Sequence, residues 1–368
     1  MAGKVKIGII GTGVGIRTML PGFRLLEDTE VTAICGSSEE RSQEIAKRYG
    51  IQKAFGCYRD LCDLPELDLV CIASPNVYHY EHAMYAIGKG KHVLCEKPVA
   101  LTREEISSLL DKSGSTDRIC VVNHQLRFSP HFNKVRDMIK NGDIGKPYFV
   151  RIHQQSSAFT DRNAPWNWGF DESKGGGFRL SMGTHLADLV SFWFGNSVYT
   201  VKGSMHPVID ERIDDQGRKR KVVVSAFFSA ELAMENNISV QLSSTAASCG
   251  VYQFDVSIYG THGELHFDSK NGLSGYFSEK KGVQKNIAVE GMQNYWQVEN
   301  ITFFGATFRY FAPCIVNAIK YSDKSFIKNA SGFDDALHTY DILEAIRASS
   351  IQGTCVTLKE GYSANCQI

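Results

Sequence analysis

Short apolar runs alternate with helical patterns over the first third of the chain. The runs that predict strands are Val5–Ile10, Val31–Cys35, Leu69–Ala73 and His92–Cys95. The segments between them, such as Glu39–Tyr49 and His79–Lys89, have the spacing of helices. Continuous apolar strands that alternate with helices are typical of a parallel sheet covered on both faces. We therefore expect an α/β domain over residues 1–125, with a doubly wound (Rossmann) parallel sheet that binds a dinucleotide.

After Arg127 the pattern changes from α/β to longer segments that alternate apolar and polar residues. Such alternation indicates antiparallel strands with one covered face. Helices are predicted at Pro130–Asn141, within a Gly- and Trp-rich stretch at Asn163–Gly195, and at Phe333–Ser349. The predicted strands are Pro147–Gln154, Val198–Gly203, Lys221–Ser229, Asn237–Ser244, Tyr252–Tyr259 and Glu264–Phe267. Residues 126–368 should form an α+β domain with a large, mainly antiparallel open sheet.

Composition excludes some partners. The 368 residues are 43% hydrophobic, and 40 Lys and Arg balance 40 Asp and Glu. A net charge of zero argues against binding nucleic acid or an anionic membrane. No apolar stretch reaches the roughly 18 residues of a spanning helix, and the N-terminus lacks the core of a signal peptide. The cysteines form no Cys-x-x-Cys pair, so we expect reduced thiols in a soluble cytoplasmic protein. The basic run Arg218–Lys221 follows acidic residues and predicts a solvated hairpin tip.

A glycine loop follows the first predicted strand. Gly11, Thr12, Gly13 and Val14 lie between that strand and a helix, the context in which a Gly-x-Gly pattern binds a pyrophosphate. The third small residue is expected at position 16, but Ile16 stands there and glycine comes one place early. The loop alone is a weak signal, and an ordinary strand–turn–helix is the alternative.

The end of the second predicted strand bears on the choice of cofactor. An acidic residue at this place would bind the ribose hydroxyls of NAD. Here Ser37 and Ser38 are followed by Arg41, and a guanidinium suits a 2′-phosphate. The serines could equally cap the next helix. We predict NADP in preference to NAD, with NAD as the alternative cofactor.

Two longer motifs are more specific than the glycine loop. The first is Pro75-Asn76-Val77-Tyr78-His79, and the second is Gly90-Lys91-His92-Val93-Leu94-Cys95-Glu96-Lys97-Pro98. Together with Asn123 and Arg127-Phe128, they closely resemble the glucose–fructose oxidoreductase / inositol dehydrogenase (Gfo/Idh/MocA) family. The resemblance covers nearly the whole chain and is weakest beyond about residue 270.

The resemblance implies roles for residues of the first domain. Ser74, Pro75, Asn76 and His79 would line the cofactor groove, and Arg127 would help to form it. Glu96 would hold the nicotinamide ribose. Lys97 would lie beside the reacting carbon, contact substrate and act as the acid–base group. A cationic nicotinamide nearby would suit this by lowering the pKa of the lysine.

In the second domain, the resemblance implies that His185 is the catalytic histidine and binds substrate. Ser181 stands where the family usually has Asp, so the usual charge near the substrate is missing. Trp166 could stack on a sugar ring, although packing is an equal alternative. Arg162, Arg179 and Tyr252 are further candidate polar contacts.

These residues predict an oxidoreductase that moves a hydride between a sugar-like secondary alcohol and the nicotinamide of NADP(H). The alternatives are a non-catalytic NADP-sensing regulator and an NAD-dependent glycoside hydrolase of the same family. His79 and His82 have helical spacing but lack further ligands, so we expect no metal. The resemblance also implies that residues 126–368 serve substrate binding and oligomerisation, and that the protein is a homodimer or homotetramer.

Overall fold

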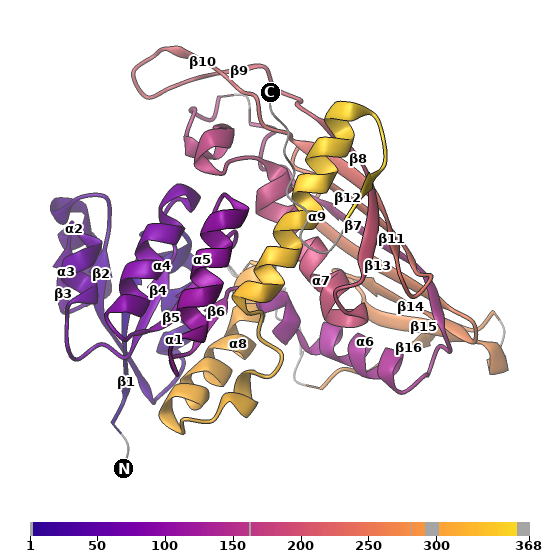
Figure 1. Cartoon of the computed structure of the whole chain (residues 1–368), viewed down its shortest axis with the longest axis horizontal. Helices are drawn as coiled ribbons and strands as arrows, with labels where there is room; N and C mark the ends of the chain where they lie inside the picture. Colours follow the sequence, from indigo (N-terminus) through magenta and orange to yellow (C-terminus); the bar gives the residue numbers. More distant parts are fainter. Residues whose placement is uncertain (1–2, 162, 281, 291–301, 359–368) are drawn as a thin grey trace. The chain divides into compact units, whose positions relative to one another are not determined.

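The computed structural model describes residues 3–161, 163–280, 282–290 and 302–358 (Figure 1). It divides into two compact units. Unit 1 runs from the N-terminus to Ser129 and resumes in a later segment that ends at Leu337. Unit 2 begins at Pro130, is interrupted by that segment, and resumes at His338. Unit 1 thus includes a segment that the predicted division at residue 125 assigned to the second domain.

Unit 1 is built on a six-stranded sheet in the order β3-β2-β1-β4-β5-β6, with every adjacent pair parallel. This is the doubly wound order, so the predicted Rossmann architecture is confirmed. The strands are β1 (Val5–Ile10), β2 (Thr29–Cys35), β3 (Lys53–Phe55), β4 (Leu69–Ile72), β5 (His92–Cys95) and β6 (Cys120–Val122). The helices are α1 (Leu20–Arg24), α2 (Glu39–Tyr49), α3 (Tyr58–Cys62), α4 (His79–Gly88), α5 (Arg103–Gly114) and α8 (Phe303–Lys320).

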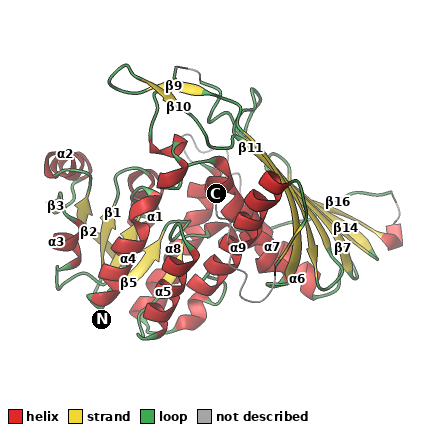
Figure 2. Ribbon diagram, turned by 45° about the horizontal axis from the view of Figure 1, so that its top comes forward, coloured by secondary structure: helices red, strands yellow, loops and turns green. Residues whose placement is uncertain are grey.

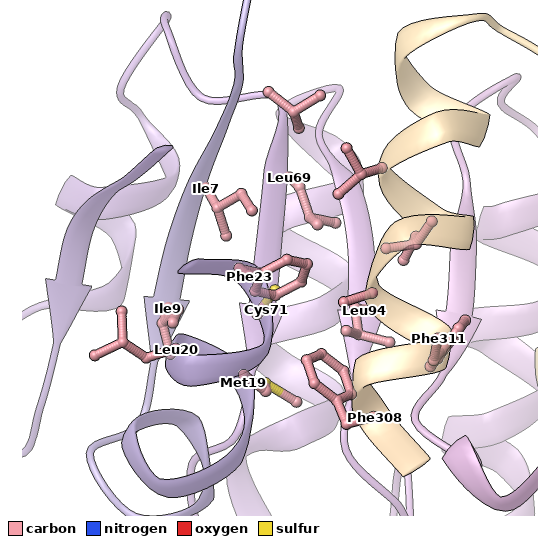
Figure 3. Packing of buried hydrophobic residues seen from close by; sticks show 14 of the residues in the cluster. Ile7, Ile9, Met19, Leu20, Phe23, Leu69, Cys71, Leu94, Phe308 and Phe311 are labelled. Atoms are coloured by element: carbon pink, nitrogen blue, oxygen red, sulfur yellow. The ribbon is translucent and has the colours of Figure 1, made fainter. Parts of the chain in front are cut away.

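Helix α8 lies in unit 1, although the sequence pattern did not predict this helix and the predicted division placed its residues in the second domain. Its Phe308 packs edge-to-face on Phe23 at 5.4 Å between ring centroids, and its Phe311 stacks on Phe128 at 4.2 Å. Both α8 rings are fully buried in the cluster around β1, β4 and β5 (Figure 3). The helix therefore completes the hydrophobic core of a domain whose other elements lie almost two hundred residues earlier.

Unit 2 contains a nine-stranded sheet in the order β16-β15-β14-β13-β7-β12-β11-β8-β17 (Figure 2). Only the β7–β12 pair is parallel, so the prediction of a mainly antiparallel sheet is confirmed. The strands of this sheet are β7 (Pro147–Gln155), β8 (Val198–His206), β11 (Phe227–Met234), β12 (Ser239–Thr245), β13 (Gln253–Gly260), β14 (Gly263–Asp268), β15 (Gly272–Phe277), β16 (Lys285–Asn286) and β17 (Val356–Thr357).

The predicted strand at Lys221–Ser229 differs from the observed structure. Its first residue belongs to a separate hairpin of β9 (Glu211–Ile213) and β10 (Lys219–Lys221), and β11 starts only at Phe227. The intervening Val222 and Val224 are buried in a small cluster with Phe170. The side chains of these two valines thus belong to a second, smaller core and do not lie on a face of the large sheet. The basic run lies at the predicted hairpin, where Asp214 accepts hydrogen bonds from two of its arginines.

One face of the large sheet is covered. Along β7, Val150 and Ile152 are fully buried while the residues between them are not. The main helices of unit 2 are α6 (Pro130–Lys140), α7 (Thr184–Phe194) and most of α9 (Phe333–Gln352). The indole of Trp193 on α7 donates a hydrogen bond to the carbonyl of Phe132 on α6, at 3.1 Å. Within the described residues, no helix is long and apolar enough to cross a membrane.

Candidate active site

The glycine loop joins β1 to a helix in unit 1, and each of its glycines is required for a different structural reason. Gly11 has φ +114°, and a Cβ there would lie 2.1 Å from the carbonyl oxygen of Ala73. Only glycine fits this close crossing of the β1 and β4 exits. A Cβ at Gly13 would meet nothing within 4 Å, so its backbone faces open space. That is the position at which a pyrophosphate would need close approach to the chain.

The third glycine explains the irregular spacing seen in the sequence. A Cβ on Gly15 would lie 2.6 Å from the Cγ2 methyl of Ile9, so position 15 is where the helix packs directly on β1. The helix starts there as a π-turn, Gly15–Met19, which has a wider spacing than an α-helix. Ile16 is only 7% exposed and packs in the core. The third small residue of the Gly-x-Gly pattern, which allows the helix to pack closely on the strand, is therefore present at position 15 instead of position 16.

The end of β2 places a positive charge next to the glycine loop. The Arg41 Nε donates a hydrogen bond to the Thr12 hydroxyl, at 3.3 Å. Ser38 caps helix α2 by accepting from the Arg41 backbone amide, while Ser37 is exposed. The two explanations that the sequence left open for this segment are thus compatible. One serine caps the helix, and the arginine side chain reaches across to Thr12 of the loop.

Glu96 and Lys97 follow β5 at the carboxyl edge of the sheet. Glu96 is buried and accepts a hydrogen bond from the side-chain amide of Asn123, at 2.6 Å. Burial raises the pKa of Glu96, partly opposed by the charge of Lys97 and by the Asn123 hydrogen bond. Burial lowers the pKa of Lys97, opposed by Glu96. A lysine that loses its proton more readily than usual is suited to acid–base work.

The other predicted residues of unit 1 lie at the same edge. Ser74 and Pro75 follow β4, and Asn76 begins a short 3-10 turn before α4. His79, the first residue of α4, is fully buried, with both ring nitrogens within hydrogen-bonding distance of backbone carbonyls. His79 therefore contacts the backbone of the segments that follow β4 and β5, and its ring is not exposed to a groove. Arg127 is buried and pairs with Asp335, at 3.0 Å.

In unit 2, His185 is buried in the first turn of α7. A π-turn, Arg179–Gly183, precedes it and contains Ser181 as its one exposed residue. Arg179 is 5% exposed and binds Glu344 of α9 at 2.8 Å, so it anchors this turn instead of offering a free guanidinium. Inserted π-turns occur often at functional sites, and this one marks the segment that carries both predicted residues.

Trp166 lies in a lobe that has its own small core in unit 2. Its ring has Arg220 and Lys174 at 5.5 and 5.9 Å from the centroid, and it packs on the Phe170 cluster. These contacts favour the packing alternative for this tryptophan. Tyr252 is 39% exposed, next to β13, while Arg162 lies outside the described residues.

Comparisons with known proteins decide the family. Residues 5–124 match the model of the "Oxidoreductase family, NAD-binding Rossmann fold", and residues 132–266 match that of the "GFO/IDH/MocA C-terminal domain". The chain belongs to the Gfo/Idh/MocA oxidoreductase family. The resemblance inferred from the motifs at residues 75–79 and 90–98 is thereby confirmed.

Relatives within the Gfo/Idh/MocA family include sugar and polyol dehydrogenases. The chain is 26% identical to myo-inositol 2-dehydrogenase of Thermotoga maritima, over 76% of this chain and 79% of that protein. It is 27% identical to glucose-6-phosphate 3-dehydrogenase of Bacillus subtilis, over 72% and 75%. A levoglucosan dehydrogenase, solved in complex with NADH and L-sorbose, has the same fold, with a TM-score of 0.85, 22% identity and coverage of 97% and 99%.

The residues present fit a dinucleotide cofactor. The loop at Gly13 is open to a phosphate, and Thr12 and Arg41 lie beside it. Asn123, fully buried, keeps a side-chain oxygen without a hydrogen-bond partner next to Glu96, an acceptor of the kind that a ribose hydroxyl would use. Among the described residues, no group of three or more His, Cys, Asp or Glu side chains is placed to hold a metal ion.

Proposed function

We propose that this protein is an oxidoreductase that transfers a hydride between a sugar-like secondary alcohol and NADP(H). The observation that carries the proposal is the Glu96–Asn123 pair beside Lys97, at the edge of the sheet that also bears the open Gly13 loop. The dehydrogenase names of the relatives support a sugar or polyol as substrate.

When bound, the nicotinamide supplies the hydride acceptor or donor. In this proposal Gly11, Gly13 and Val14 offer the phosphate cradle, and Glu96 holds a ribose hydroxyl. Lys97 moves the proton of the substrate hydroxyl, and its lowered pKa suits that task. His185 is the second proton-handling group, and Ser181 gives the substrate a hydrogen bond without a charge.

The preference for NADP over NAD rests on Arg41. Its guanidinium reaches Thr12 from the end of β2, so it could bind a 2′-phosphate bidentately next to the glycine loop. The family has an NAD-binding Rossmann fold and the levoglucosan dehydrogenase was solved with NADH, so NAD is the competing cofactor.

Calorimetric titration of NADP, NADPH, NAD and NADH, followed by a turnover screen, tests both parts. We expect Arg41→Ala to lose about 10- to 100-fold in NADP(H) affinity, the equivalent of one or two charge-assisted hydrogen bonds, and nothing for NAD(H). Arg48→Ala, at the far end of the same helix, is the matched control. A preference for NAD(H) that ignores Arg41 would overturn the NADP assignment.

The screen uses myo-inositol, glucose 6-phosphate and levoglucosan with each oxidised cofactor. Net formation of reduced nicotinamide supports the dehydrogenase. Tight cofactor binding without net or transient reduction would favour the regulator. Release of the alcohol from an added aryl glycoside, without net reduction of the cofactor, would favour the hydrolase. We also propose that two copies of the chain associate through the less covered face of the large sheet, and analytical ultracentrifugation measures that oligomeric state. We further propose that the protein resides in the cytoplasm.

A further inference from the structure

His79 has two hydrogen-bonding contacts that the proposed chemistry does not use. Its Nε2 lies 2.8 Å from the carbonyl oxygen of Ser74, and its Nδ1 lies 2.7 Å from the carbonyl oxygen of Pro98. Ser74 belongs to the segment that leaves β4, and Pro98 directly follows Lys97 in the segment that leaves β5. One imidazole therefore bridges the exits of two adjacent parallel strands.

The bridge is rigid because of where the ring lies. His79 is 0% exposed and sits at the start of α4, a helix that packs on both strands. Water cannot replace either contact at a fully buried ring, and a backbone carbonyl left without a donor would be costly. A Lys97–Pro98 segment held in this way carries the lysine side chain at a fixed place.

The contacts also link His79 to the charge of Lys97. A neutral imidazole has one N–H, so it donates to one carbonyl, and only the protonated ring donates to both. Burial lowers the pKa of His79, and the charge of Lys97 acts in the same direction, against both carbonyls. The neutral ring is therefore the favoured state: it donates one hydrogen bond to one of the two carbonyls, while its other nitrogen lies against the second carbonyl oxygen.

We propose that His79 is a positioning residue that fixes the Lys97–Pro98 segment to the Ser74 segment and so places the Lys97 amine. The inference rests on the proposed function for its catalytic meaning, but its geometry stands on unit 1 alone. A histidine that merely filled space would be replaceable by any ring of similar size.

The test measures the reactivity of Lys97 itself, which needs no substrate. An amine-acylating reagent is applied over a pH series, and peptide mass spectrometry follows Lys97 against the exposed Lys47 as internal reference. In His79→Phe we expect Lys97 to be acylated about fivefold faster or more, the change that loss of one or two ordinary hydrogen bonds produces. The pH midpoint of Lys97 labelling should rise, because the released amine is less buried. His79→Gln, which restores one donor, should fall between.

The matched control is His82→Phe. His82 is on the same helix, is also buried, and contacts the Ser74 hydroxyl at 3.0 Å, but no contact joins it to the Pro98 carbonyl. We expect Lys97 labelling in this variant to equal wild type. Equal labelling of Lys97 in wild type, His79→Phe and His79→Gln, or the same increase in His82→Phe, would overturn the proposal.

Turnover separates this inference from the proposed function. If the wild type reduces NADP or NAD with a sugar, His79→Phe should lower kcat more than it raises KM, because the amine is misplaced rather than the substrate lost. If wild type shows no turnover with any sugar, the proposed function fails while the labelling result still decides the role of His79.

Discussion

Two glycines of the loop should separate stability from cofactor binding. A methyl group at position 15 would lie 2.6 Å from Ile9 Cγ2, whereas one at position 13 would meet no atom within 4 Å. Ile9 is fully buried and β-branched, so it has little freedom to turn away. Gly15→Ala therefore overpacks the junction of helix and strand, while Gly13→Ala leaves the folded chain unstrained.

The size of the effect follows from two opposing terms. Overpacking a core costs about 1–3 kcal/mol, and the better helix propensity of alanine returns up to about 1 kcal/mol. We expect Gly15→Ala to lose about 1–2 kcal/mol of unfolding free energy, or about 2–8 °C in Tm for a domain of this size. Gly13→Ala should stay within about 0.5 kcal/mol of wild type.

Cofactor affinity should respond in the opposite way. The Gly13→Ala methyl occupies the space that a pyrophosphate needs, so NADPH affinity should fall about 10- to 100-fold, equivalent to about 1.4–2.8 kcal/mol. Gly15→Ala should bind nearly as wild type below its melting temperature. Thermal melts and calorimetry on the same preparations give both quantities. Equal loss of stability in the two variants, or an unchanged NADPH affinity in Gly13→Ala, would refute this reasoning.

Three further predictions concern charged groups. Burial raises the pKa of Glu96, so the stability that its neutral carboxyl contributes below the unfolded pKa is lost as pH rises through the folded pKa. The gain in unfolding free energy from Glu96→Gln, measured by urea unfolding, should therefore grow as pH rises above the unfolded pKa of Glu96. Burial alone would raise the pKa of Glu344, but Arg179 and Arg347 lower it overall. The stability that the ionised Glu344 contributes should therefore be lost as pH falls through its folded pKa. Acid unfolding of Glu344→Gln should show a weaker pH dependence in that range. Arg179→Met should cost about 1–3 kcal/mol of unfolding free energy, because the buried Glu344 keeps Arg347 but loses its ion pair with Arg179, and the double variant with Glu344→Leu should recover part of the loss in the same unfolding assay. An unfolding free energy of Arg179→Met equal to that of wild type would contradict the anchoring role of the Arg179–Glu344 pair.

Local signals in the sequence predicted much of unit 1. Helix α2 has the predicted bounds because Ser38 caps its start and Gly50, with φ +60°, ends it. The family motifs predicted which residues gather at the edge of the sheet. Helix α8 was missed because the apolar partners of Phe308 and Phe311 lie in β1, β4 and β5, far away in sequence.

Residue type alone did not reveal what each site residue contacts. Arg127 pairs with Asp335, which stands 208 positions later, and Arg179 pairs with Glu344, 165 positions later. No local pattern connects such partners, so the sequence could not separate a buried structural arginine from one that faces a ligand. His79 is a similar case, since its two carbonyl contacts come from the backbone and leave no trace in the residue pattern.

The return of α8 to unit 1 has a consequence for synthesis of the protein. The ribosome has delivered β1 to β6 long before it delivers Phe308 and Phe311, which come after all the strands of the large sheet except β17. At about 5–20 residues per second, the nascent Rossmann segment waits on the order of ten seconds or more with one side of its core uncovered. Residues 3–129 expressed alone should accordingly aggregate or bind chaperones, and supplying the α8 segment as a separate peptide should restore solubility.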